Sequence, residues 1–263
     1  MTILGISKDG QMVKAITSIH HTVIVGSVGI GKTCGYVPLN VLLENKHSLF
    51  VIDWYGELEG IYSYKKEQGY QVYIYDLKQK DTLERFRNNL GSKKGNKKVM
   101  FVQGGDKVSD KQLYELLVEL RKVSWREGLH VILDDYGAYQ IPEIASMFSL
   151  WRGHNIGISL VLQNLLSINS ARDWNCILNN SHFLLGQGDH SEVECEWFIK
   201  QIKTETIVND KRVLYEIASL GKNRALLISF VERIGKDSNY KFVKMLYTDE
   251  ILSDCRNLKK YAT

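Results

Sequence analysis

The stretch GSVGIGKT, from Gly26 to Thr33, decides the fold. It fits the pattern GxxxxGK(S/T) of a phosphate-binding loop, in which glycines let backbone N–H groups wrap around phosphates. In such a loop Lys32 reaches the β- and γ-phosphates, and the Thr33 hydroxyl binds Mg²⁺. The apolar run HTVIV, from His21 to Val25, comes directly before the loop and predicts a buried parallel strand. A helix is expected to start at about Gly31, with its amino end facing the anion.

All eight loop residues are candidates for binding a nucleotide. They are Gly26, Ser27, Val28, Gly29, Ile30, Gly31, Lys32 and Thr33. The alternative is a glycine-rich turn that binds no nucleotide, and the strand directly before the loop counts against it.

Strand and helix patterns alternate along the rest of the chain. Strand-like runs follow at Ser48 to Asp53, Gln71 to Asp76, Lys98 to Gln103, His130 to Asp134, Ile156 to Gln163 and Ser181 to Leu185. Helical patterns cover Lys32 to Glu44, Glu57 to Gln68, Asp110 to Trp125, Pro142 to Trp151 and Glu192 to Lys203. A hairpin within the first 20 residues and two closing strands, Arg224 to Phe230 and Lys241 to Tyr247, complete the set. Because most strands are apolar along their whole length, we expect an α/β fold with a mainly parallel sheet flanked by helices on both faces.

One prediction concerns the helix after the loop. Pro38 falls inside the range Lys32 to Glu44. Proline lacks an N–H and its ring clashes with the preceding turn, so a kink is expected there.

Composition bounds the class of protein. The chain has 263 residues, of which 44% are hydrophobic, two prolines and no Ser/Gly-rich run, so a single domain over residues 1–263 is expected. Its four cysteines form no CxxC pair, which argues against a zinc site or a disulfide framework. No 18-residue apolar window or signal-peptide layout is present, so the expected location is cytoplasmic. His20 and His21 have no acid or cysteine at ligand spacing and are expected to be structural.

Positive charge is concentrated in one segment. The net charge is +4, yet residues 78–98 hold eight Lys or Arg against two acids. Such a segment either follows a nucleic acid backbone or forms a solvated loop, and the sequence leaves both open.

Acids and polar residues at strand ends suggest catalysis. The run VILDD places Asp134 and Asp135 at the end of a strand, where one acid binds Mg²⁺ and the next polarises the attacking water. We assign these roles in that order. Gln163 ends a later strand and is a candidate γ-phosphate sensor, or else a residue that contacts backbone. Arg152 either completes a neighbouring subunit's site or pairs with carbonyl groups at a helix end.

Taken together, these motifs resemble a known family. The runs are GSVGIGKTCGYVPLN, SLFVIDWYGELEGIYSYKKEQGYQVYIYDL and HVILDDYGAYQIPEIASMFSLWRGHNIGISLVLQNLLSI. They look like the nucleotide-binding domain of type IV secretion system coupling proteins, the TraG/TraD-like conjugation ATPases of the FtsK/HerA superfamily. Pro38, the acid-Gly-Glu-Leu segment (Asp53, Gly56, Glu57, Leu58) and the Asn-rich NCILNNSHFLLGQGD have counterparts there, and the resemblance covers residues 18 to 250.

The resemblance implies a RecA-like P-loop motor that uses ATP and Mg²⁺. Such motors assemble as homo-oligomers, typically hexameric rings. They pass single-stranded DNA with an attached relaxase-type protein to a secretion channel. Carried over to this chain, Lys32 and Thr33 bind phosphate and Mg²⁺, Asp134 binds Mg²⁺, Asp135 activates water, Gln163 senses the γ-phosphate and Arg152 acts in trans.

The chain departs from the family pattern in four places. About 20 residues precede the motor instead of membrane helices, so a membrane partner is expected to recruit it to the inner face of the membrane, or it is cytosolic. The basic segment 78–98 stands where the family has an all-helical domain. Tyr55 replaces a lysine, and Asp135 replaces a glutamate that is one methylene longer, which would slow water activation.

Three other functions remain open at this point. A viral genome-packaging ATPase of the FtsK/HerA kind shares the same core. A nucleotide-switched binding or scaffold protein would bind ATP with little turnover, as Asp135 and Tyr55 would allow. A small-molecule kinase is disfavoured because no arginine-rich lid segment is present.

Overall fold

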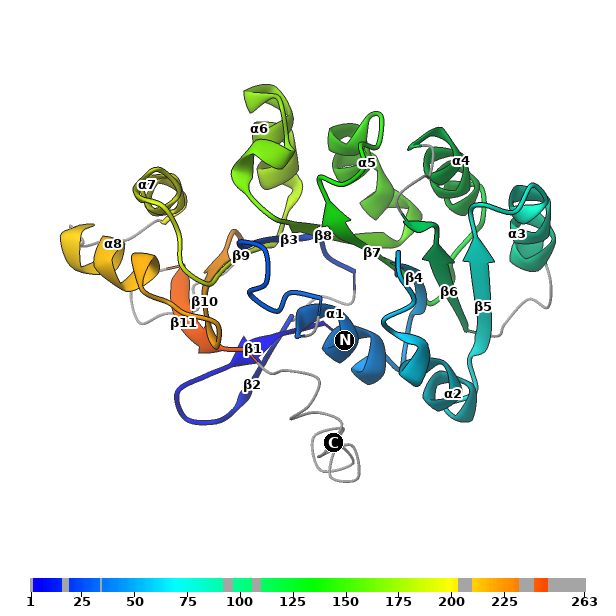
Figure 1. Cartoon of the computed structure of the whole chain (residues 1–263), viewed down its shortest axis with the longest axis horizontal. Coiled ribbons are helices and arrows are strands. Elements are labelled where there is room, and N and C mark those ends of the chain that lie inside the picture. Colours follow the sequence, from blue (N-terminus) through cyan, green and yellow to red (C-terminus); the bar gives the residue numbers. More distant parts are fainter. Residues whose placement is uncertain are drawn as a thin grey trace.

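One large sheet organises the chain (Figure 1). The computed structural model describes residues 2–15, 19–33, 35–91, 97–105, 110–202, 210–231 and 239–245. Within them, eleven strands lie in the order β2-β1-β11-β10-β9-β3-β8-β7-β4-β6-β5.

Seven neighbouring strands of this sheet are parallel. They are β3 (Thr22–Val25), β4 (Ser48–Ile52), β5 (Gln71–Asp76), β6 (Lys98–Gln103), β7 (Leu129–Tyr136), β8 (Ile156–Leu162) and β9 (Phe183–Gln187). Each corresponds to a predicted strand, and β5 and β6 match residue for residue. The parallel part therefore confirms the predicted sheet.

The other end of the sheet is antiparallel. It contains β1 (Ile3–Ile6), β2 (Met12–Lys14), β10 (Arg224–Ser229) and β11 (Tyr240–Lys244). The predicted hairpin and the two closing strands are thus all present, and they extend the sheet beyond β9. Parts of five predicted segments lie outside the described residues: residues 1 and 16–18 of the N-terminal hairpin region, Cys34 of the first predicted helix, 92–96 of the basic segment, Lys203 and residues 246–247.

Helices cover both faces of the sheet, as predicted. The described helices are α1 (Tyr36–Leu43), α2 (Glu59–Glu67), α3 (Thr82–Gly91), α4 (Asp110–Arg121), α5 (Ile144–Leu150), α6 (Ala171–Asn180), α7 (Glu192–Gln201) and α8 (Asp210–Ala218). Side chains of α3 to α8 build the core on one face, and those of α1 and α2 belong to the core on the other. Sequence analysis did not predict α6 and α8. None of the described helices is long and apolar enough to cross a membrane.

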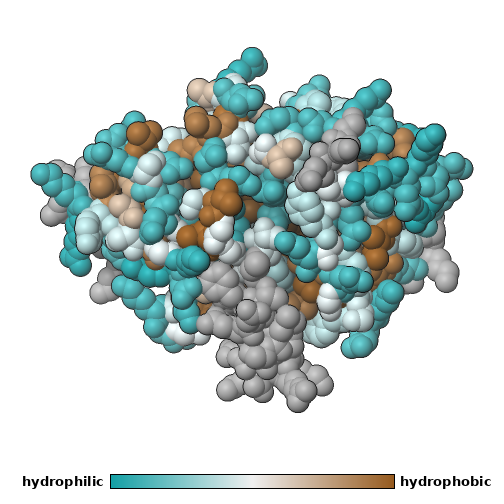
Figure 2. Space-filling model, in the orientation of Figure 1, coloured by the Kyte–Doolittle hydropathy of each residue, from teal (hydrophilic) through white to brown (hydrophobic). Residues whose placement is uncertain are grey.

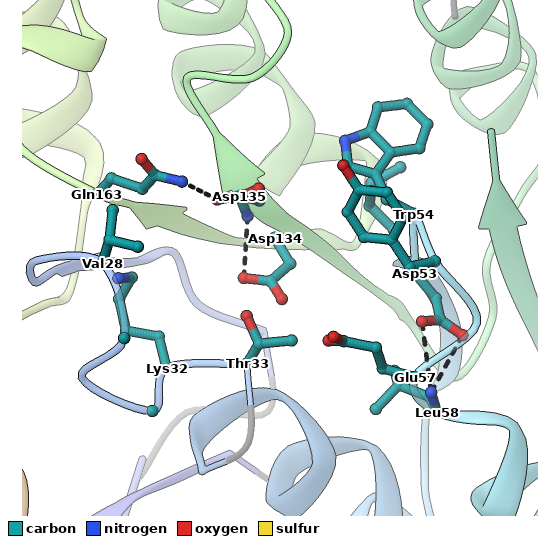
Figure 3. A pocket seen from close by; sticks show the side chains of 14 residues that line it. Val28, Lys32, Thr33, Asp53, Trp54, Glu57, Leu58, Asp134, Asp135 and Gln163 are labelled. Atoms are coloured by element: carbon teal, nitrogen blue, oxygen red, sulfur yellow. Dashed lines mark hydrogen bonds between the residues drawn. The ribbon is translucent and has the colours of Figure 1, made fainter. Parts of the chain in front are cut away.

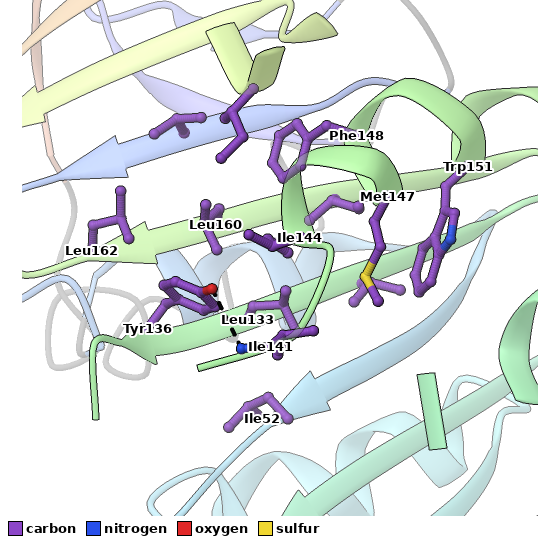
Figure 4. Packing of buried hydrophobic residues seen from close by; sticks show 14 of the residues in the cluster. Ile52, Leu133, Tyr136, Ile141, Ile144, Met147, Phe148, Trp151, Leu160 and Leu162 are labelled. Carbon is purple, nitrogen blue, oxygen red and sulfur yellow. Dashed lines mark hydrogen bonds between the residues drawn. The ribbon is translucent and has the colours of Figure 1, made fainter. Parts of the chain in front are cut away.

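The larger core fixes the strands that carry the acids. In Figure 4, Ile144 and Phe148 of α5 lie over Leu133 of β7 and Leu160 of β8. All four are nearly or fully buried, and burial of each such side chain stabilises the fold by roughly 1.5–3 kcal/mol. Neighbouring residues of β7 alternate between the two cores, so Ile132 faces the side of α1. The positions at the end of β7 are therefore set by packing on both faces.

The predicted start and kink of the first helix are wrong. Regular helix begins at Tyr36, so Pro38 lies in its first turn, where no N–H is required. At this start the Gly35 N–H donates to the carbonyl of Gly31 at 2.7 Å, and the Val37 N–H donates to that of Lys32 at 3.3 Å. Because the helix begins at Tyr36, the N–H that Pro38 lacks is not needed for a hydrogen bond within the helix.

The basic segment 78–98 contains α3, which packs at the β5 end of the sheet. Several of its cations already have partners in the fold. Arg87 donates to Glu119 at 2.7 Å, and the Lys98 ammonium donates to the carbonyl of Leu90 at 2.8 Å. Figure 2 shows mainly hydrophilic side chains over this end of the molecule. The described part of the segment therefore behaves largely as a solvated, internally paired surface.

Candidate functional site

A pocket of about 300 Å³ opens at the carboxyl ends of β3, β8, β7 and β4 (Figure 3). Its walls are Val28, Gly29, Gly31, Lys32, Thr33, Ile52, Asp53, Trp54, Tyr55, Glu57, Leu58, Asp134, Asp135 and Gln163. The loop, both acids of β7 and the glutamine after β8 are thus brought together, as the sequence predicted. Ligands of open parallel sheets bind at this edge.

Glycines are required at defined points of the loop. A Cβ on Gly26 would lie 2.5 Å from the backbone oxygen of Gln187, which is a clash. Gly29 and Gly31 have φ angles of +74° and +89°, which residues other than glycine rarely adopt. The loop also leans on β9, because the Gln187 amide donates to the carbonyl of Ile30 at 3.1 Å. Its shape is therefore fixed by backbone conformation and by the neighbouring strand.

Lys32 is the cationic side chain among the residues that line the pocket. Only 6% of this residue is exposed, and its ammonium donates to the carbonyls of Gly26 at 2.5 Å and Ser27 at 2.8 Å. Burial lowers the pKa of Lys32, and the charges of Asp134 and Asp135 oppose that shift. A phosphate is a stronger partner for an ammonium than a neutral carbonyl, so Lys32 is suited to exchange these contacts for an anion.

Asp134 lies beside Thr33 because β7 carries a bulge at its end. The register with β8 slips between Leu133 and Tyr136, so one extra residue of β7 is accommodated there. The Thr33 side chain lies near the Asp134 carboxylate and favours its charged form (Figure 3). Burial nevertheless raises the pKa of Asp134 to about 6, because desolvation outweighs the effect of Thr33 and of the Asp135 N–H.

Asp135 is turned away from its neighbour by the same bulge. Its φ of +55° is left-handed, and its N–H donates to the Asp134 carboxylate at 2.9 Å. The Gln163 amide donates a short hydrogen bond to the Asp135 carboxylate. The two candidate catalytic side chains therefore form one unit, with Asp135 orienting Gln163.

The wall opposite the loop was not predicted as part of the site. Asp53 and Glu57 entered the sequence analysis only through a family resemblance, yet both line the pocket. Asp53 is held by the Tyr62 hydroxyl at 2.6 Å and by the N–H of Leu58 at 3.3 Å. In Figure 3 the Glu57 side chain points into the pocket toward Thr33. An acid at the end of an apolar strand was the signal in the sequence for this wall.

Arg152 does not reach this pocket in its own chain. It belongs to a short 3₁₀ turn, Trp151–His154, that precedes β8, whereas Gln163 follows β8. Its charge acts instead on the buried His21 and His182, whose pKa values it helps to lower. The structure thus places Arg152 at the opposite edge of the sheet.

The donor set fits Mg²⁺ bound together with a nucleotide. Thr33 and Asp134 offer a hydroxyl and a carboxylate, the hard oxygen ligands that Mg²⁺ prefers alongside phosphate oxygens and water. Among the described residues, no group of three or more His, Cys, Asp or Glu side chains could hold a metal on its own. Mg²⁺ would therefore arrive with phosphates.

Comparison with known proteins agrees with this site. The family described as type IV secretory system conjugative DNA transfer matches residues 5–91, which include the loop and the wall formed after β4. The predicted resemblance to coupling proteins is confirmed. A sequence search among curated proteins finds no match.

Solved structures confirm the predicted P-loop NTPase fold. The unbound bacterial conjugative coupling protein TrwBΔN70 matches with a TM-score of 0.58 and 10% identity, over 93% of this chain and 89% of that one. TrwB in complex with ADP and Mg²⁺ has a TM-score of 0.57 and 10% identity, over 86% and 85%. VirB4 of Thermoanaerobacter pseudethanolicus matches with a TM-score of 0.55 and 11% identity, over 94% and 96%.

Proposed function

We propose that this chain is the motor of a coupling-type system, an ATPase that moves DNA and its attached protein to a type IV secretion or conjugation channel. The observation that carries the proposal is the pocket, in which a phosphate-binding loop meets Asp134, Asp135 and Gln163 from two other strands. The family match over residues 5–91 supports the link to DNA transfer.

ATP and Mg²⁺ are the proposed ligands. The backbone of residues 26–33 and the Lys32 ammonium would hold the phosphates, while Thr33 and Asp134 would hold Mg²⁺. When bound, Mg²⁺ neutralises charge on the phosphate oxygens. The glycine conformations, the buried ammonium and the pair of oxygen ligands support this assignment. That TrwB was solved with ADP and Mg²⁺ agrees with it.

Asp135 and Gln163 form the proposed γ-phosphate side of the site. Because Gln163 is hydrogen-bonded to Asp135, a change at the γ-phosphate would reach β7 and β8 together. The sequence predicts that a carboxylate on this side of the site activates the water and assigns that role to Asp135.

A homo-oligomeric ring, with six subunits as in the family, is part of the proposal. Arg152 lies at the opposite edge of the sheet from its own pocket, so it can contribute only to the pocket of another copy. Mixing Lys32→Ala subunits with Arg152→Ala subunits tests this. Restored turnover in the mixture would support action in trans, and its absence would leave Arg152 as a structural residue.

The remaining expectations concern organisation and partners. We propose one motor domain over residues 1–263, with segment 78–98 in place of a helical insertion. Arg87 is paired with Glu119 and Lys98 with the carbonyl of Leu90, which supports a solvated surface segment over one that follows a DNA backbone. The proposed cargo is single-stranded DNA with a relaxase-type protein, and a membrane-anchored partner would recruit the motor to the cytoplasmic face of the channel.

The test is ATP turnover by the purified protein as its concentration rises, with and without single- and double-stranded DNA. The proposal predicts turnover that rises cooperatively with protein concentration and is stimulated by DNA. A preference for double-stranded DNA would favour genome packaging instead. Turnover that no nucleic acid changes would contradict the proposal.

One observation favours a second candidate. The Asp135 carboxylate is already hydrogen-bonded to Gln163. The Asp135 side chain is also one methylene shorter than the glutamate of the family pattern. A nucleotide-switched binding protein would then bind ATP tightly and turn it over hardly at all. The same assay separates the two functions, because this candidate predicts saturable binding without product.

A further inference from the structure

We propose that Glu57, rather than Asp135, accepts the proton of the attacking water, so that the catalytic carboxylate comes from the turn after β4. This inference rests on the proposed ATPase function. Its starting point is that four acids line one pocket in different states: Asp53, Asp134, Asp135 and Glu57.

Asp134 is the proposed Mg²⁺ ligand, and its position is fixed. Its carboxylate accepts a hydrogen bond from the Asp135 N–H at 2.9 Å and lies near the Thr33 side chain. Its backbone oxygen accepts the Tyr139 hydroxyl at 2.8 Å. These contacts fix Asp134 against the loop.

Asp135 is committed to Gln163. The bulge and the left-handed φ of +55° aim this short side chain along the sheet edge toward the next strand, where the Gln163 amide donates to it. A carboxylate that accepts a proton from water must give up or share such a bond. Asp135 is therefore better placed to orient Gln163 than to act as a base.

Glu57 differs from the other acids of the pocket because its side chain is uncommitted. Across the part of the chain that the structure describes, it makes no hydrogen bond or ion pair, and it is exposed. Figure 3 shows its carboxylate entering the pocket from the side opposite Val28 and Lys32, directed at Thr33. It therefore faces the region that the phosphates and Mg²⁺ would occupy.

The backbone that carries Glu57 is held firmly. Gly56 has a φ of +75°, and its N–H donates to the carbonyl of Asp53 at 3.1 Å. The Leu58 N–H donates to the Asp53 carboxylate at 3.3 Å. That carboxylate is fixed in turn by the Tyr62 hydroxyl, to which the Gln103 amide donates at 3.0 Å. A base needs this kind of support, because proton transfer depends on hydrogen-bond reach.

Sheet order brings this turn to the right place. β4 lies next to β7, so the residues that follow both strands share one edge of the sheet. Glu57 is also one methylene longer than Asp135, which extends its reach into the pocket. This chain has Asp135 where the family pattern has a glutamate beside the metal-binding aspartate. In our proposal Glu57, from the turn after the neighbouring strand β4, supplies the glutamate carboxylate instead.

The proposed step balances as follows. The oxygen of a water molecule forms a bond to the γ-phosphorus of ATP, and the bond from that phosphorus to the β,γ-bridging oxygen breaks. The bridging oxygen leaves with both electrons as part of ADP. One proton of the water passes to the Glu57 carboxylate and is later released, leaving inorganic phosphate.

The test compares Glu57→Gln, Asp135→Asn and the control Glu59→Gln in the full chain. Glu59 is an exposed acid at the start of α2 and does not line the pocket. Turnover is measured with ATP, Mg²⁺ and DNA, and affinity is measured with a fluorescent non-hydrolysable ATP analogue. General-base loss predicts that Glu57→Gln lowers turnover by about 100-fold or more, while analogue affinity stays within about threefold. Glu59→Gln should match wild type, and Asp135→Asn should lose less than about tenfold.

Each other outcome overturns the assignment. Glu57→Gln turning over like wild type, or losing no more than Asp135→Asn, would return the base to Asp135 or share it between them. Loss of analogue binding in Glu57→Gln would make Glu57 a binding residue. Wild-type protein that binds the analogue without hydrolysing ATP would remove the ATPase function itself, and the wild-type arm alone reveals that case.

Discussion

The two edges of the parallel strands bury polar side chains of different kinds. At the carboxyl edge, Lys32 and Asp134 face the pocket as opposite charges. At the amino edge, the buried His21, His130 and His182 lie at the starts of β3, β7 and β9. Burial lowers the pKa of all three, to about 3 for His21, so they stay neutral at physiological pH. These three histidines stay neutral, whereas Lys32 and Asp134 place opposite charges at the carboxyl edge.

Hydrogen bonding explains the difference. The amino edge is closed by a chain of neutral groups in which Ser159 Oγ lies 2.9 Å from the Tyr36 hydroxyl and 2.8 Å from His130 Nε2. The other ring nitrogen of His130 lies 3.4 Å from the Thr2 hydroxyl. These four side chains are paired with one another, whereas the Lys32 ammonium at the carboxyl edge donates to the carbonyls of Gly26 and Ser27, which an anion can replace. The amino edge should therefore affect stability, and the carboxyl edge should affect ligand binding and catalysis.

The largest expected effect is that of Lys32→Ala. Removal of the buried ammonium should lower ATP turnover by on the order of 10²- to 10³-fold, since a preorganised charge on the phosphates is lost. Lys66→Ala, on the exposed side of α2, is the control and should match wild type. The comparison between the edges would break if Lys32→Ala kept its turnover but unfolded more readily.

Asp134→Asn should exchange activity for stability. The pKa of this carboxyl is raised to about 6 in the fold, from 3.8. Its contribution to stability is thus complete below pH 3.8 and is lost as the pH rises through 6, where a buried charge remains. At pH 7.5 the free energy of unfolding of the variant should be about 1–3 kcal/mol higher than that of wild type. The variant should retain little ATP turnover.

Urea unfolding at pH 7.5 and pH 4.5 checks this. The gain should be present at the higher pH and shrink at the lower one. A variant less stable than wild type at both values would show that Asp134 holds the fold and not a ligand.

Ser159→Ala should damage the amino edge alone. Loss of its hydroxyl leaves His130 Nε2 without its bond, which costs about 1–3 kcal/mol in the free energy of unfolding. Analogue affinity, measured with the folded variant, should not change. Ser149→Ala, at an exposed hydroxyl of α5, provides the control. A clear fall in affinity for Ser159→Ala would mean that the two edges are coupled.

His21→Asn should flatten the response to acid. The folded pKa of about 3 lies below the usual 6.5, so the unfolded chain binds the extra proton between these values and stability falls as the pH falls. The expected slope from this group is up to about 1.4 kcal/mol per pH unit. Asn retains an acceptor for the Ile158 N–H, which lies 3.0 Å from His21 Nδ1.

Unfolding midpoints between pH 6.5 and 5.0 measure this slope for wild type and variant. Equal slopes would show that His21 does not titrate on unfolding in this range. Over the same interval Asp134 should act with the opposite sign, so the two variants together separate the edges.

Local patterns predicted most of the fold. The β5 and β6 strands follow from runs of apolar and β-prone residues, and the Leu-rich face of α4 follows from helical spacing. The α6 segment is amphipathic, with Trp174, Ile177 and Leu178 buried, but it is short and rich in asparagine, which favours helix only weakly, and it was not predicted as a helix. The α1 start depended on where Pro38 would be tolerated, which is decided by the turn before it.

The site was predicted as far as motifs extend. The loop follows from its motif, and Asp134, Asp135 and Gln163 follow from strand ends. These three residues line the pocket, as do five of the eight loop residues, whereas Gly26, Ser27 and Ile30 do not. Glu57 was missed as a pocket residue because its position depends on β4 pairing with β7, a contact between residues about 80 apart along the chain. The bulge that turns Asp135 toward Gln163 is likewise set by pairing between strands.

The central claim is that the carboxyl edge binds a nucleotide while the amino edge only holds the fold. Calorimetric titration of a non-hydrolysable ATP analogue with Mg²⁺ into wild type, Lys32→Ala and Ser159→Ala tests it most directly. One site per chain is predicted, with equal affinity in wild type and Ser159→Ala and affinity weaker by on the order of 100-fold in Lys32→Ala. Binding that is absent from wild type, or unchanged in Lys32→Ala, would contradict the claim.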